Sequence, residues 1–392
     1  MGGKVFSARL SKEKDWRGAL EEAVSGVKRE LGENPCDLAV FFVSEAYQDF
    51  DPRVFVEAFS ELLPHRVSIG CNSSGVIGSE SEVEMKPALS VMAMHLPGVR
   101  LHPFSLSSDE ARSLESGADI IQLLDVYPPD KPHFICLADP MSFEVTRFLN
   151  VLNEGYKGLP VIGGLASGAA AGAPNWLSLN GTVYREGVVG AALTGAIAFD
   201  SLVSQGCRPV GRPYVVTKAE GNVIHELAGK SPLAVLQELM LELPPKDRQL
   251  ARHSLFVGLV MKETQSDFKR GDFLIRNITG FDPGAEALMV GEFLRVGQTI
   301  QFQLRDAETS DEDLRVLLER LSDRRGASAG GILVSCCGRG KGFFGEADHD
   351  VRLIQSLRGP LPLAGFFANG EIGPVGGKNY VHGYTSSLAI LR

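Results

Sequence analysis

Two charged residues near the end of the chain have the side-chain chemistry needed to hold a zwitterion. Arg339 follows an apolar run typical of a buried strand, and Glu371 follows a second such run. In a parallel arrangement the ends of these strands are adjacent, so Arg339 and Glu371 could line one pocket or simply pair with each other. Because arginine suits a carboxylate and glutamate suits an ammonium group, the pair predicts a ligand such as an amino acid.

Glycine-rich turns could place backbone and hydroxyl groups on such a ligand. Glycine has no side chain, so the backbone can approach a bound molecule closely at these turns. Together with Arg339 and Glu371, the predicted ligand-binding residues are Gly70, Cys71, Asn72, Ser73, Ser74, Gly163, Gly164, Cys337, Asn369 and Gly370. The polar side chains could equally bond only to local backbone in tight turns, and both interpretations stay open.

Cysteine offers an alternative chemistry, which is nucleophilic catalysis by Cys71 or Cys337. Cys337 lies two residues before Arg339, and a nearby positive charge can lower a thiol pKa. A reactive thiol also needs a base, and no His or Lys lies beside Cys71 in the sequence. The chain shows no complete catalytic constellation, so we expect no enzyme, with a cysteine-dependent enzyme as the alternative.

The eight histidines are isolated from one another along the chain. His349 and His382 could each bind haem or a metal ion, or could be ordinary solvated or core histidines. The six cysteines form no C-x-x-C pair, which argues against a structural zinc site. We therefore expect no cofactor and no metal, with a haem-binding sensor as an alternative.

The elements that must position these residues recur three times along the chain. Each copy has an apolar strand, a polar loop, an amphipathic helix, a proline and a second strand that runs into closely spaced glycines. The second strands lead to residues 69–75, 162–168 and 364–370. We expect Gly70, Gly164 and Gly365 at equivalent strand ends, with Pro64, Pro160 and Pro362 before those strands.

The recurrence predicts an α/β fold of two domains. Each repeated strand-helix-strand unit carries an appended β-hairpin, of which the Asn180-Gly181 turn is the clearest, and helices cover mixed sheets. The predicted segments are an N-terminal helical extension at 1–34, a first domain at 35–245 and a second at 246–392, with the boundary at a proline pair. The glycine turns of the first and third copies are expected to face a cleft between the domains.

Composition narrows the classes of partner. A net charge of −9 and scattered basic residues argue against nucleic acid, which is bound by clustered Lys and Arg. No apolar run approaches the ~18 residues that cross a bilayer, and the N-terminus lacks the apolar segment of a signal peptide. We expect a cytoplasmic protein that contacts neither membranes nor nucleic acid.

With these residues in view, the chain resembles the FIST family. The similarity is carried by residues 70–78 (GCNSSGVIG), 163–164 (GG), 337–340 (CGRG) and 365–374 (GFFANGEIGP), and it covers roughly residues 35 to 391. The resemblance implies FIST N-terminal and C-terminal domains, which form a small-molecule sensory module proposed for ligands such as amino acids, with haem in some members. The sequence carries no kinase, cyclase or F-box segment, so any output would pass to a separate signalling protein. The prediction is a cytoplasmic small-ligand-binding sensory protein without catalytic output of its own.

Overall fold

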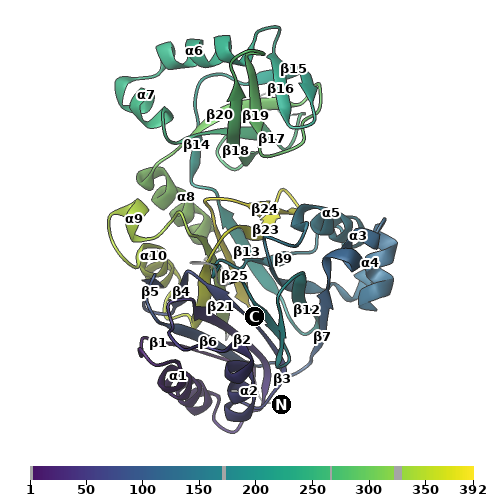
Figure 1. Cartoon of the computed structure of the whole chain (residues 1–392), viewed down its shortest axis with the longest axis vertical. Coiled ribbons are helices and arrows are strands. Elements are labelled where there is room, and N and C mark those ends of the chain that lie inside the picture. The colour runs from purple at the N-terminus through teal and green to yellow at the C-terminus, as the bar shows by residue number, and fades with distance from the viewer. Residues whose placement is uncertain (1–2, 170–173, 265–266, 322–328) are drawn as a thin grey trace. The chain divides into compact units, whose positions relative to one another are not determined.

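The computed structural model describes residues 3–169, 174–264, 267–321 and 329–392 of the chain (Figure 1). These residues form two compact units, of which unit 1 comprises Met1–Val203 and Arg315–Arg392, and unit 2 comprises Ser204–Leu314. Unit 2 is therefore inserted into the sequence of unit 1. The compact units differ from the predicted segments 35–245 and 246–392, because the proline pair at 244–245 lies inside unit 2.

The described residues of unit 1 form three six-stranded sheets that share one topology. The first has the order β1 (Val5–Ser11), β6 (Leu89–His95), β2 (Cys36–Ser44), β3 (His65–Ser73), β10 (Leu177–Leu179), β11 (Thr182–Tyr184). The second has the order β7 (Val99–Leu106), β12 (Val188–Gly195), β8 (His133–Ala138), β9 (Val161–Leu165), β23 (Glu371–Val375), β24 (Lys378–His382). The third has the order β13 (Phe199–Ser204), β25 (Ser386–Leu391), β21 (Gly330–Cys336), β22 (Leu363–Ala368), β4 (Gly75–Gly78), β5 (Glu82–Glu84).

The predicted repeat is the parallel pair in the middle of each sheet. β2 and β3, β8 and β9, and β21 and β22 are parallel, and a helix connects each pair. Pro64, Pro160 and Pro362 each stand immediately before the second strand, as expected. The α/β fold class with repeated strand-helix-strand units, appended hairpins and mixed sheets is confirmed.

The hairpins are exchanged among the repeats in a cycle. β4–β5 follows β3 in sequence but pairs with β22, β10–β11 follows β9 but pairs with β3, and β23–β24 follows β22 but pairs with β9. Each sheet is thus completed by a hairpin from another repeat. This exchange explains why all three copies lie in one compact unit, which corrects the assignment of the third copy to a separate domain.

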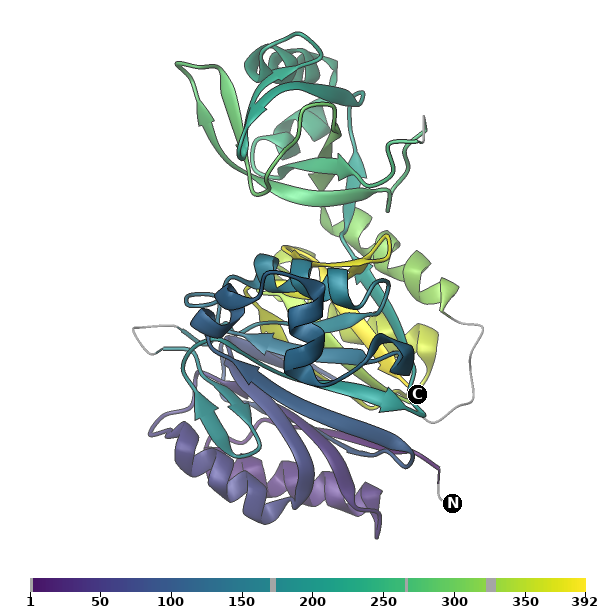
Figure 2. The same cartoon turned by 90° about the vertical axis from the view of Figure 1, so that its right-hand side faces the viewer.

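Helices cover the outer faces of the sheets (Figures 1 and 2). The first sheet carries α1 (Trp16–Leu31) and α2 (Pro52–Leu62), and the second carries α3 (Ser108–Ser113), α4 (Gly117–Leu124) and α5 (Val145–Gly155). α9 (Lys341–Phe344) and α10 (His349–Arg358) connect the parallel strands of the third. Residues 1–34 are not an extension, because β1 pairs with β6 and α1 packs on the same sheet.

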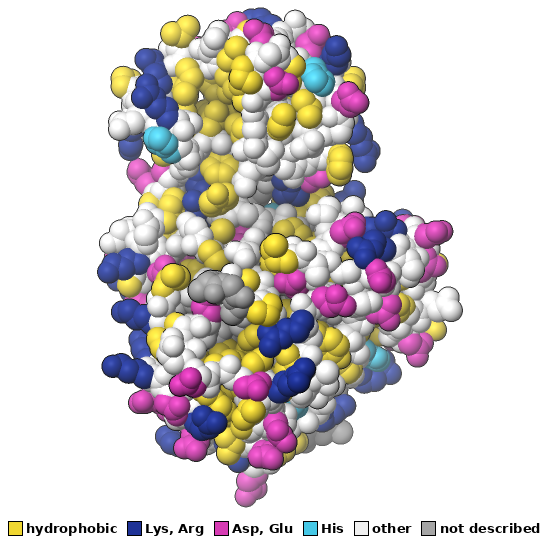
Figure 3. Space-filling model, viewed as in Figure 1, with side chains coloured by type: hydrophobic (Ala, Val, Ile, Leu, Met, Phe, Trp, Pro, Cys, Tyr) yellow, Lys and Arg dark blue, Asp and Glu magenta, His cyan; other side chains and the backbone are white. Residues whose placement is uncertain are grey.

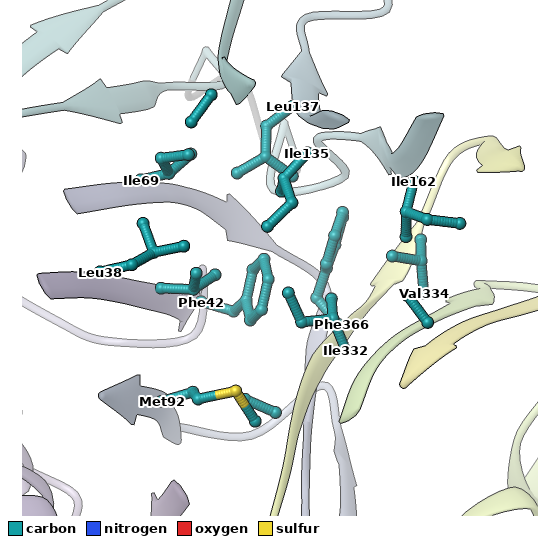
Figure 4. Packing of buried hydrophobic residues seen from close by; sticks show 14 of the residues in the cluster. Leu38, Phe42, Ile69, Met92, Ile135, Leu137, Ile162, Ile332, Val334 and Phe366 are labelled. Carbon is teal, nitrogen blue, oxygen red and sulfur yellow. The ribbon is translucent and has the colours of Figure 1, made fainter. Parts of the chain in front are cut away.

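The inner faces of the three sheets share one hydrophobic core, which the strands build by strict alternation. On β2, Leu38, Val40 and Phe42 enter this core, while the residues between them pack under α1 and α2. Phe42 stacks on Phe366 of the third repeat at 4.7 Å between ring centroids. Figure 4 shows side chains from the parallel strands of all three repeats directed at one another.

Unit 2 is a small antiparallel β-barrel. Its strands follow the order β14 (Cys207–Pro209), β20 (Thr299–Arg305), β15 (Tyr214–Glu220), β16 (Val223–Leu227), β19 (Ala287–Val290), β18 (Phe273–Asp282), β17 (Leu255–Val260), and pairing of β17 with β20 closes the ring. α6 (Pro232–Glu242) and α7 (Pro245–Ala251) lie between β16 and β17 in the sequence, and α8 (Ala307–Arg320) leads back into unit 1. Residues 255–304 of the third repeat's predicted domain thus supply β17, β18, β19 and β20 of this barrel.

Candidate functional site

Backbone hydrogen bonds define equivalent positions at the strand ends of the three repeats. The N–H groups of Ser44, Asp139 and Cys336 each donate to the segment that leads into the antiparallel neighbour strand, at 2.9–3.0 Å. In each parallel pair of strands, the residue three positions before this N–H group lies opposite a glycine. These pairs are Phe41 with Gly70, Cys136 with Gly163, and Leu333 with Gly365. The glycine of the second repeat that is equivalent to Gly70 and Gly365 is therefore Gly163. The prediction of Gly164 was wrong by one residue.

This alignment shows the same short pattern in all three repeats. Four residues after the equivalent glycines stand Ser74, Ser167 and Asn369, and each is followed by another glycine. The pattern is therefore G-x-x-x-S-G twice and G-x-x-x-N-G once. It places a short polar side chain at the end of the second parallel strand of every repeat.

The three polar residues meet, together with Cys337, at what we call the three-turn junction (Ser74, Ser167, Cys337 and Asn369). Ser74 N donates to Ser167 Oγ at 3.0 Å, and Ser74 Oγ lies 3.2 Å from Cys337 Sγ. Ser167 Oγ donates to the Phe367 carbonyl, and Asn369 N donates to the Leu165 carbonyl at 3.1 Å. Residues separated by 93 and 263 positions in sequence are thus in direct contact.

The junction reaches the surface through part of its members. Cys337 and Asn369 are exposed and Ser74 is half-buried, whereas Ser167 is buried. All four lie in unit 1, so the turns of the first and third copies meet within one compact unit, and the expected cleft between domains is replaced by this arrangement. The side chains of these three residues end in an amide, a thiol and a hydroxyl, which are neutral hydrogen-bonding groups.

Several predicted site glycines have a packing explanation. A Cβ on Gly70 would lie 2.2 Å from the ring of Phe41, and one on Gly163 would lie 1.7 Å from the Cys136 carbonyl oxygen. Gly164 faces Val334 at 2.6 Å, and a Cβ on Gly370 would lie 2.8 Å from the Leu165 side chain. Glycine at these positions is required by neighbouring protein atoms in the core.

Asn72 and Ser73 make local contacts below the junction. Asn72 Oδ1 accepts from Trp176 N at 2.9 Å, and Ser73 Oγ donates to the Gly75 carbonyl at 2.8 Å. Cys71 is fully buried in β3, and burial raises the pKa of its thiol far above the ordinary value. The structure thus places these three side chains inside the protein.

Cys337 is exposed as a residue, but its thiol is not activated. Desolvation raises the pKa of the Cys337 thiol, and hydrogen bonds from Ser74 and Ser167 offset this only in part. The neighbouring Cys336 has its pKa raised to about 12 by burial. Arg339 does not act on the Cys337 thiol as the sequence suggested, because its guanidinium is bound elsewhere.

The partner of Arg339 is Asp350 on α10. Arg339 Nε and Nη2 donate to the two carboxylate oxygens of Asp350 at 3.0 and 2.8 Å, and both side chains are buried. Burial alone would raise the pKa of Asp350, but the charge of Arg339 and the hydrogen bond from His349 hold that pKa well below its ordinary value. The His349 ring stacks on Phe344 at 3.5 Å between centroids, and Arg339 Cζ lies 5.0 Å from the same Phe344 ring.

The exchanged hairpin of the first repeat holds this ion pair from the other side. Glu82 N donates to Asp348 Oδ1 at 2.7 Å, and Glu82 Oε1 accepts from Val351 N at 3.0 Å at the start of α10. Burial, followed by repulsion from Asp350, raises the pKa of Glu82 to about 8. The hairpin thereby fixes the helix that carries the partner of Arg339.

Glu371 begins β23 and is fully buried beside the same turn. Its Oε2 accepts from Thr385 N at 3.0 Å and from Thr385 Oγ1 at 2.8 Å. Burial raises the pKa of Glu371 to about 8, although the Thr385 bonds, the Cys336 thiol and the charge of Arg339 act in the opposite direction. Glu371 and Arg339 therefore lie near each other, but each has its own protein partner.

Sequence reasoning missed three residues that complete this region, namely Ser167, Asp350 and Thr385. The signal for Ser167 was present, because Ser167-Gly168 matches Ser74-Gly75 once the glycines are aligned. Asp350 follows two other polar residues at the start of a helix, where acidic side chains are common for reasons unrelated to a site. Nothing in the local sequence of Thr385 indicates that it binds Glu371.

The two candidate haem ligands are buried and hydrogen-bonded. His382 Nε2 lies 3.1 Å from the Gly373 carbonyl, and His349 Nδ1 lies 3.0 Å from Asp350 Oδ1. Among the described residues, no group of three His, Cys, Asp or Glu side chains is arranged to hold a metal ion. Each imidazole thus contacts a protein oxygen through one of its ring nitrogens.

A surface cavity of about 800 Å³ lies away from the three-turn junction. It is formed by α2 and the β10–β11 hairpin and is lined by Arg53, Glu57, Ser60, Glu61, Asn180, Gly181, Thr182 and Val183. None of these residues belongs to the predicted site. On the face shown in Figure 3, Lys and Arg side chains are interspersed with Asp and Glu, so this face has no extended basic patch.

Comparisons with known proteins agree with the motifs of the junction. The model of the FIST N domain matches residues 37–230, and that of the FIST C domain matches residues 232–374. The chain belongs to the FIST family. The boundary between the two matches falls inside unit 2, after β16, so the family domains and the compact units divide the chain differently.

Mycobacterial relatives extend over nearly the whole chain. An uncharacterized protein of Mycobacterium tuberculosis strain H37Rv is 39% identical over 381 residues, and one of Mycobacterium bovis is 38% identical over 380 residues. Each alignment covers 96% of both proteins. A crystal structure of cyanuric acid hydrolase from A. caulinodans aligns over 99% of both chains with 8% identity and a TM-score of 0.34. Within the described residues, no helix is long and apolar enough to span a membrane.

Proposed function

We propose that this FIST protein is a cytoplasmic sensory protein that binds a small polar metabolite, such as an amino acid, at the three-turn junction. It has no catalytic output of its own and passes its signal to a separate protein. The observation that carries the proposal is the convergence of one turn from each repeat on Ser74 and its neighbours, with Cys337 and Asn369 exposed.

The chemistry of the junction favours binding over catalysis. Nucleophilic catalysis by cysteine needs a thiolate and a base that accepts its proton. The hydrogen-bond neighbours of Cys337 Sγ are the Ser74 and Ser167 hydroxyls, and its pKa is raised. Neutral donors and acceptors on rigid strand ends are suited to holding a small polar molecule in one orientation.

The test is a thermal-shift screen of the full chain against amino acids and related metabolites. A ligand that binds only the folded state stabilises it by about 2.7 kcal/mol when free ligand is about 100 times Kd, which raises Tm by a few degrees. Asn369→Ala should abolish the response to the ligand, because it removes an exposed amide of the junction. Asn150→Ala, on the exposed face of α5, is the matched control and should leave the response intact.

Two results would count against this proposal. One is a flat response to a broad metabolite panel. The other is a ligand whose Tm shift survives both Asn369→Ala and Ser74→Ala, since that ligand would bind outside the junction.

A further inference from the structure

The surface cavity beside α2 lies along an open edge of the first sheet. Among the described residues β11 is the last strand of that sheet, and α2 packs against it. The cavity of about 800 Å³ is lined by residues of both elements, so it is a groove between the helix and the edge strand. An edge strand presents backbone N–H and C=O groups that can pair with another chain.

The hairpin geometry shows which backbone groups of β11 face this edge. Asn180 and Gly181 both have positive φ, at 50° and 79°, as in the two-residue turns that match strand twist. In such a hairpin the flanking pair, Leu179 and Thr182, is hydrogen-bonded, and the next pair along is not. Val183 therefore directs its N–H and C=O away from β10, towards the open edge.

The hairpin is fixed by contacts within unit 1. Ser68 N donates to Asn180 Oδ1 at 3.0 Å, and Asn180 N donates to the Ser68 carbonyl at 3.0 Å. The Val183 side chain packs against the hydrophobic cluster under α1 and α2, and on the other face the Tyr184 hydroxyl accepts from Ser105 Oγ at 3.4 Å. An added strand would thus meet a preformed edge, which lowers the entropic cost of binding.

Three charged side chains of α2 line the groove. Arg53, Glu57 and Glu61 are exposed and follow one another at four-residue intervals, so they form one stripe along the helix. Within the part of the chain that the structure describes, none of the three forms an ion pair. Four residues span about 6 Å of a helix, and alternate residues of a strand are about 6.6 Å apart. A strand lying along α2 can therefore present one side chain to each member of this stripe.

The topology sets the direction of such a strand. β2 and β3 are parallel, so α2, which connects them, runs opposite to both. β10 is antiparallel to β3 and β11 is antiparallel to β10, so β11 also runs opposite to α2. A strand antiparallel to β11, which is the more stable kind of pairing, runs in the direction of α2 and passes Arg53 before Glu57 and Glu61.

We propose that β11 accepts an antiparallel strand from a partner protein, and that this strand carries one acidic and then two basic residues at alternate positions, paired with Arg53, Glu57 and Glu61. Backbone bonds to Val183 supply affinity, and the charges of α2 select the sequence. Because β11 is a strand of 3 residues, its edge alone is too short to pair tightly with any chain. The surface would serve the output to a separate protein in the proposed function, but it does not depend on the ligand of the three-turn junction.

The experiment titrates a fluorescent peptide, Thr-Glu-Thr-Lys-Thr-Lys-Thr, with the full chain and follows anisotropy. We expect saturable binding that weakens as salt is added, because exposed charge pairs are screened. Methylation of the backbone nitrogens of the Glu and both Lys residues leaves every side chain in place but removes the donors to β11. The methylated peptide should therefore not bind.

A charge swap tests the role of α2. When Arg53→Glu, Glu57→Lys and Glu61→Lys are combined, the peptide should bind at least about tenfold more weakly, since attraction is replaced by repulsion. A peptide with inverted charges, Thr-Lys-Thr-Glu-Thr-Glu-Thr, should bind this variant and not the wild type. All three positions are exposed, so the fold should persist, which Tm verifies.

Glu21→Lys is the matched control. It lies on the exposed face of α1, outside the groove, and changes the net charge by the same amount as the charge swap. The original peptide should bind it as it binds the wild type. Equal weakening in both variants would mean that net charge alone attracts the peptide.

Further results would also overturn the proposal. No saturable binding to the wild type, or binding that survives methylation, would exclude strand addition. Binding that is indifferent to the charge swap would exclude the stripe on α2. A wild type that sediments as a dimer, beside a charge-swapped variant that is a monomer, would mean that a second copy of the chain occupies the edge.

The outcome is separable from that of the sensory site. Asn369→Ala should bind the peptide as the wild type does. A failed metabolite screen with intact peptide binding would count only against the proposed ligand site. A failed peptide titration with an intact metabolite response would count only against strand addition at β11.

Discussion

The strand ends of the second and third repeats have the same backbone hydrogen bonds but different buried polar side chains. In the second repeat, Asp139 is buried and both of its oxygens are used: Oδ1 accepts from Asn175 Nδ2 at 2.9 Å, and Oδ2 accepts from the N–H and hydroxyl of Ser142. At the equivalent position the third repeat has Cys336. Beside it lie two buried titratable side chains, Arg339, which is bound by Asp350, and Glu371, which is bound by Thr385 and the Cys336 thiol. The second repeat thus has one buried carboxylate at this strand end, whereas the third has a buried ion pair and a further buried carboxyl group.

The comparison teaches that repetition of the fold does not imply repetition of the site. All three repeats use the same hydrogen bonds to set the strand ends, and all three supply a short polar residue before a glycine. Only the third adds a buried arginine at this place. The three repeats are thus equivalent as scaffold, and the third carries the charge chemistry.

The largest expected effect comes from removing the arginine. Arg339→Ala leaves Asp350 buried without its charge partner, and breaking a buried ion pair in this way costs about 3–5 kcal/mol of unfolding free energy. Urea denaturation measures the loss. Asp139→Ala should cost less, about 1–3 kcal/mol, because it strands neutral donors only.

A double variant keeps this prediction testable if Arg339→Ala does not fold. Arg339→Met combined with Asp350→Leu removes both charges, and replacing a buried pair by apolar residues is often neutral. The double variant should therefore be more stable than Arg339→Ala alone. If the Arg339→Ala and Asp139→Ala proteins were equally stable, the third repeat would not depend more strongly on its buried charge than the second repeat does.

The next effect is a pH dependence of stability due to Glu371. The folded state keeps the proton of Glu371 up to about pH 8, whereas the unfolded chain loses it near the ordinary value of 4.5. The folded state therefore binds more protons between these values, so the contribution of Glu371 to the unfolding free energy is greatest below about 4.5 and is lost as pH rises to about 8. Glu371→Gln should flatten this part of the stability profile measured by denaturation.

Glu82 contributes in the same direction and over the same pH range, so Glu82→Gln should flatten the profile as well, and the double variant should flatten it further. Asp350 acts oppositely and only in acid, because its pKa is lowered. A wild-type stability that rises from pH 5 to pH 8 would contradict the raised pKa values of both glutamates.

The repeated scaffold could be predicted from sequence because it depends on local patterns. Alternating apolar residues, a proline and closely spaced glycines recur wherever a parallel pair is built, and these signals located all three copies. The hairpin exchange could not be predicted from local patterns, because the pairing of β4 with β22 depends on contacts between residues nearly three hundred positions apart. The same holds for the insertion of unit 2, which begins within β13 rather than at a proline-rich linker.

The sequence predicted that several candidate residues lie close together, but it did not predict which residues they contact. Ser74, Cys337, Arg339 and Glu371 do lie in one region of unit 1, as the motifs suggested. Their partners are set by tertiary structure, since Asp350 reaches Arg339 from a helix and Thr385 reaches Glu371 from the start of the last strand. Glycines such as Gly70 looked like ligand contacts because a sequence does not distinguish close approach of a ligand from close approach of a phenylalanine ring.

The smallest expected effect concerns thiol reactivity. Cys337 is the exposed cysteine of the described chain, and its equivalent turn in the second repeat has no thiol, so alkylation of the native protein reports on the third repeat alone. Desolvation raises the Cys337 pKa, so iodoacetamide near neutral pH should label it more slowly than a free thiol, and Cys337→Ser should remove most of the labelling. Mass spectrometry locates the label and gives its rate. Labelling faster than a free thiol would mean that the turn activates the sulfur, and the junction would then be better explained as the site of a cysteine-dependent enzyme.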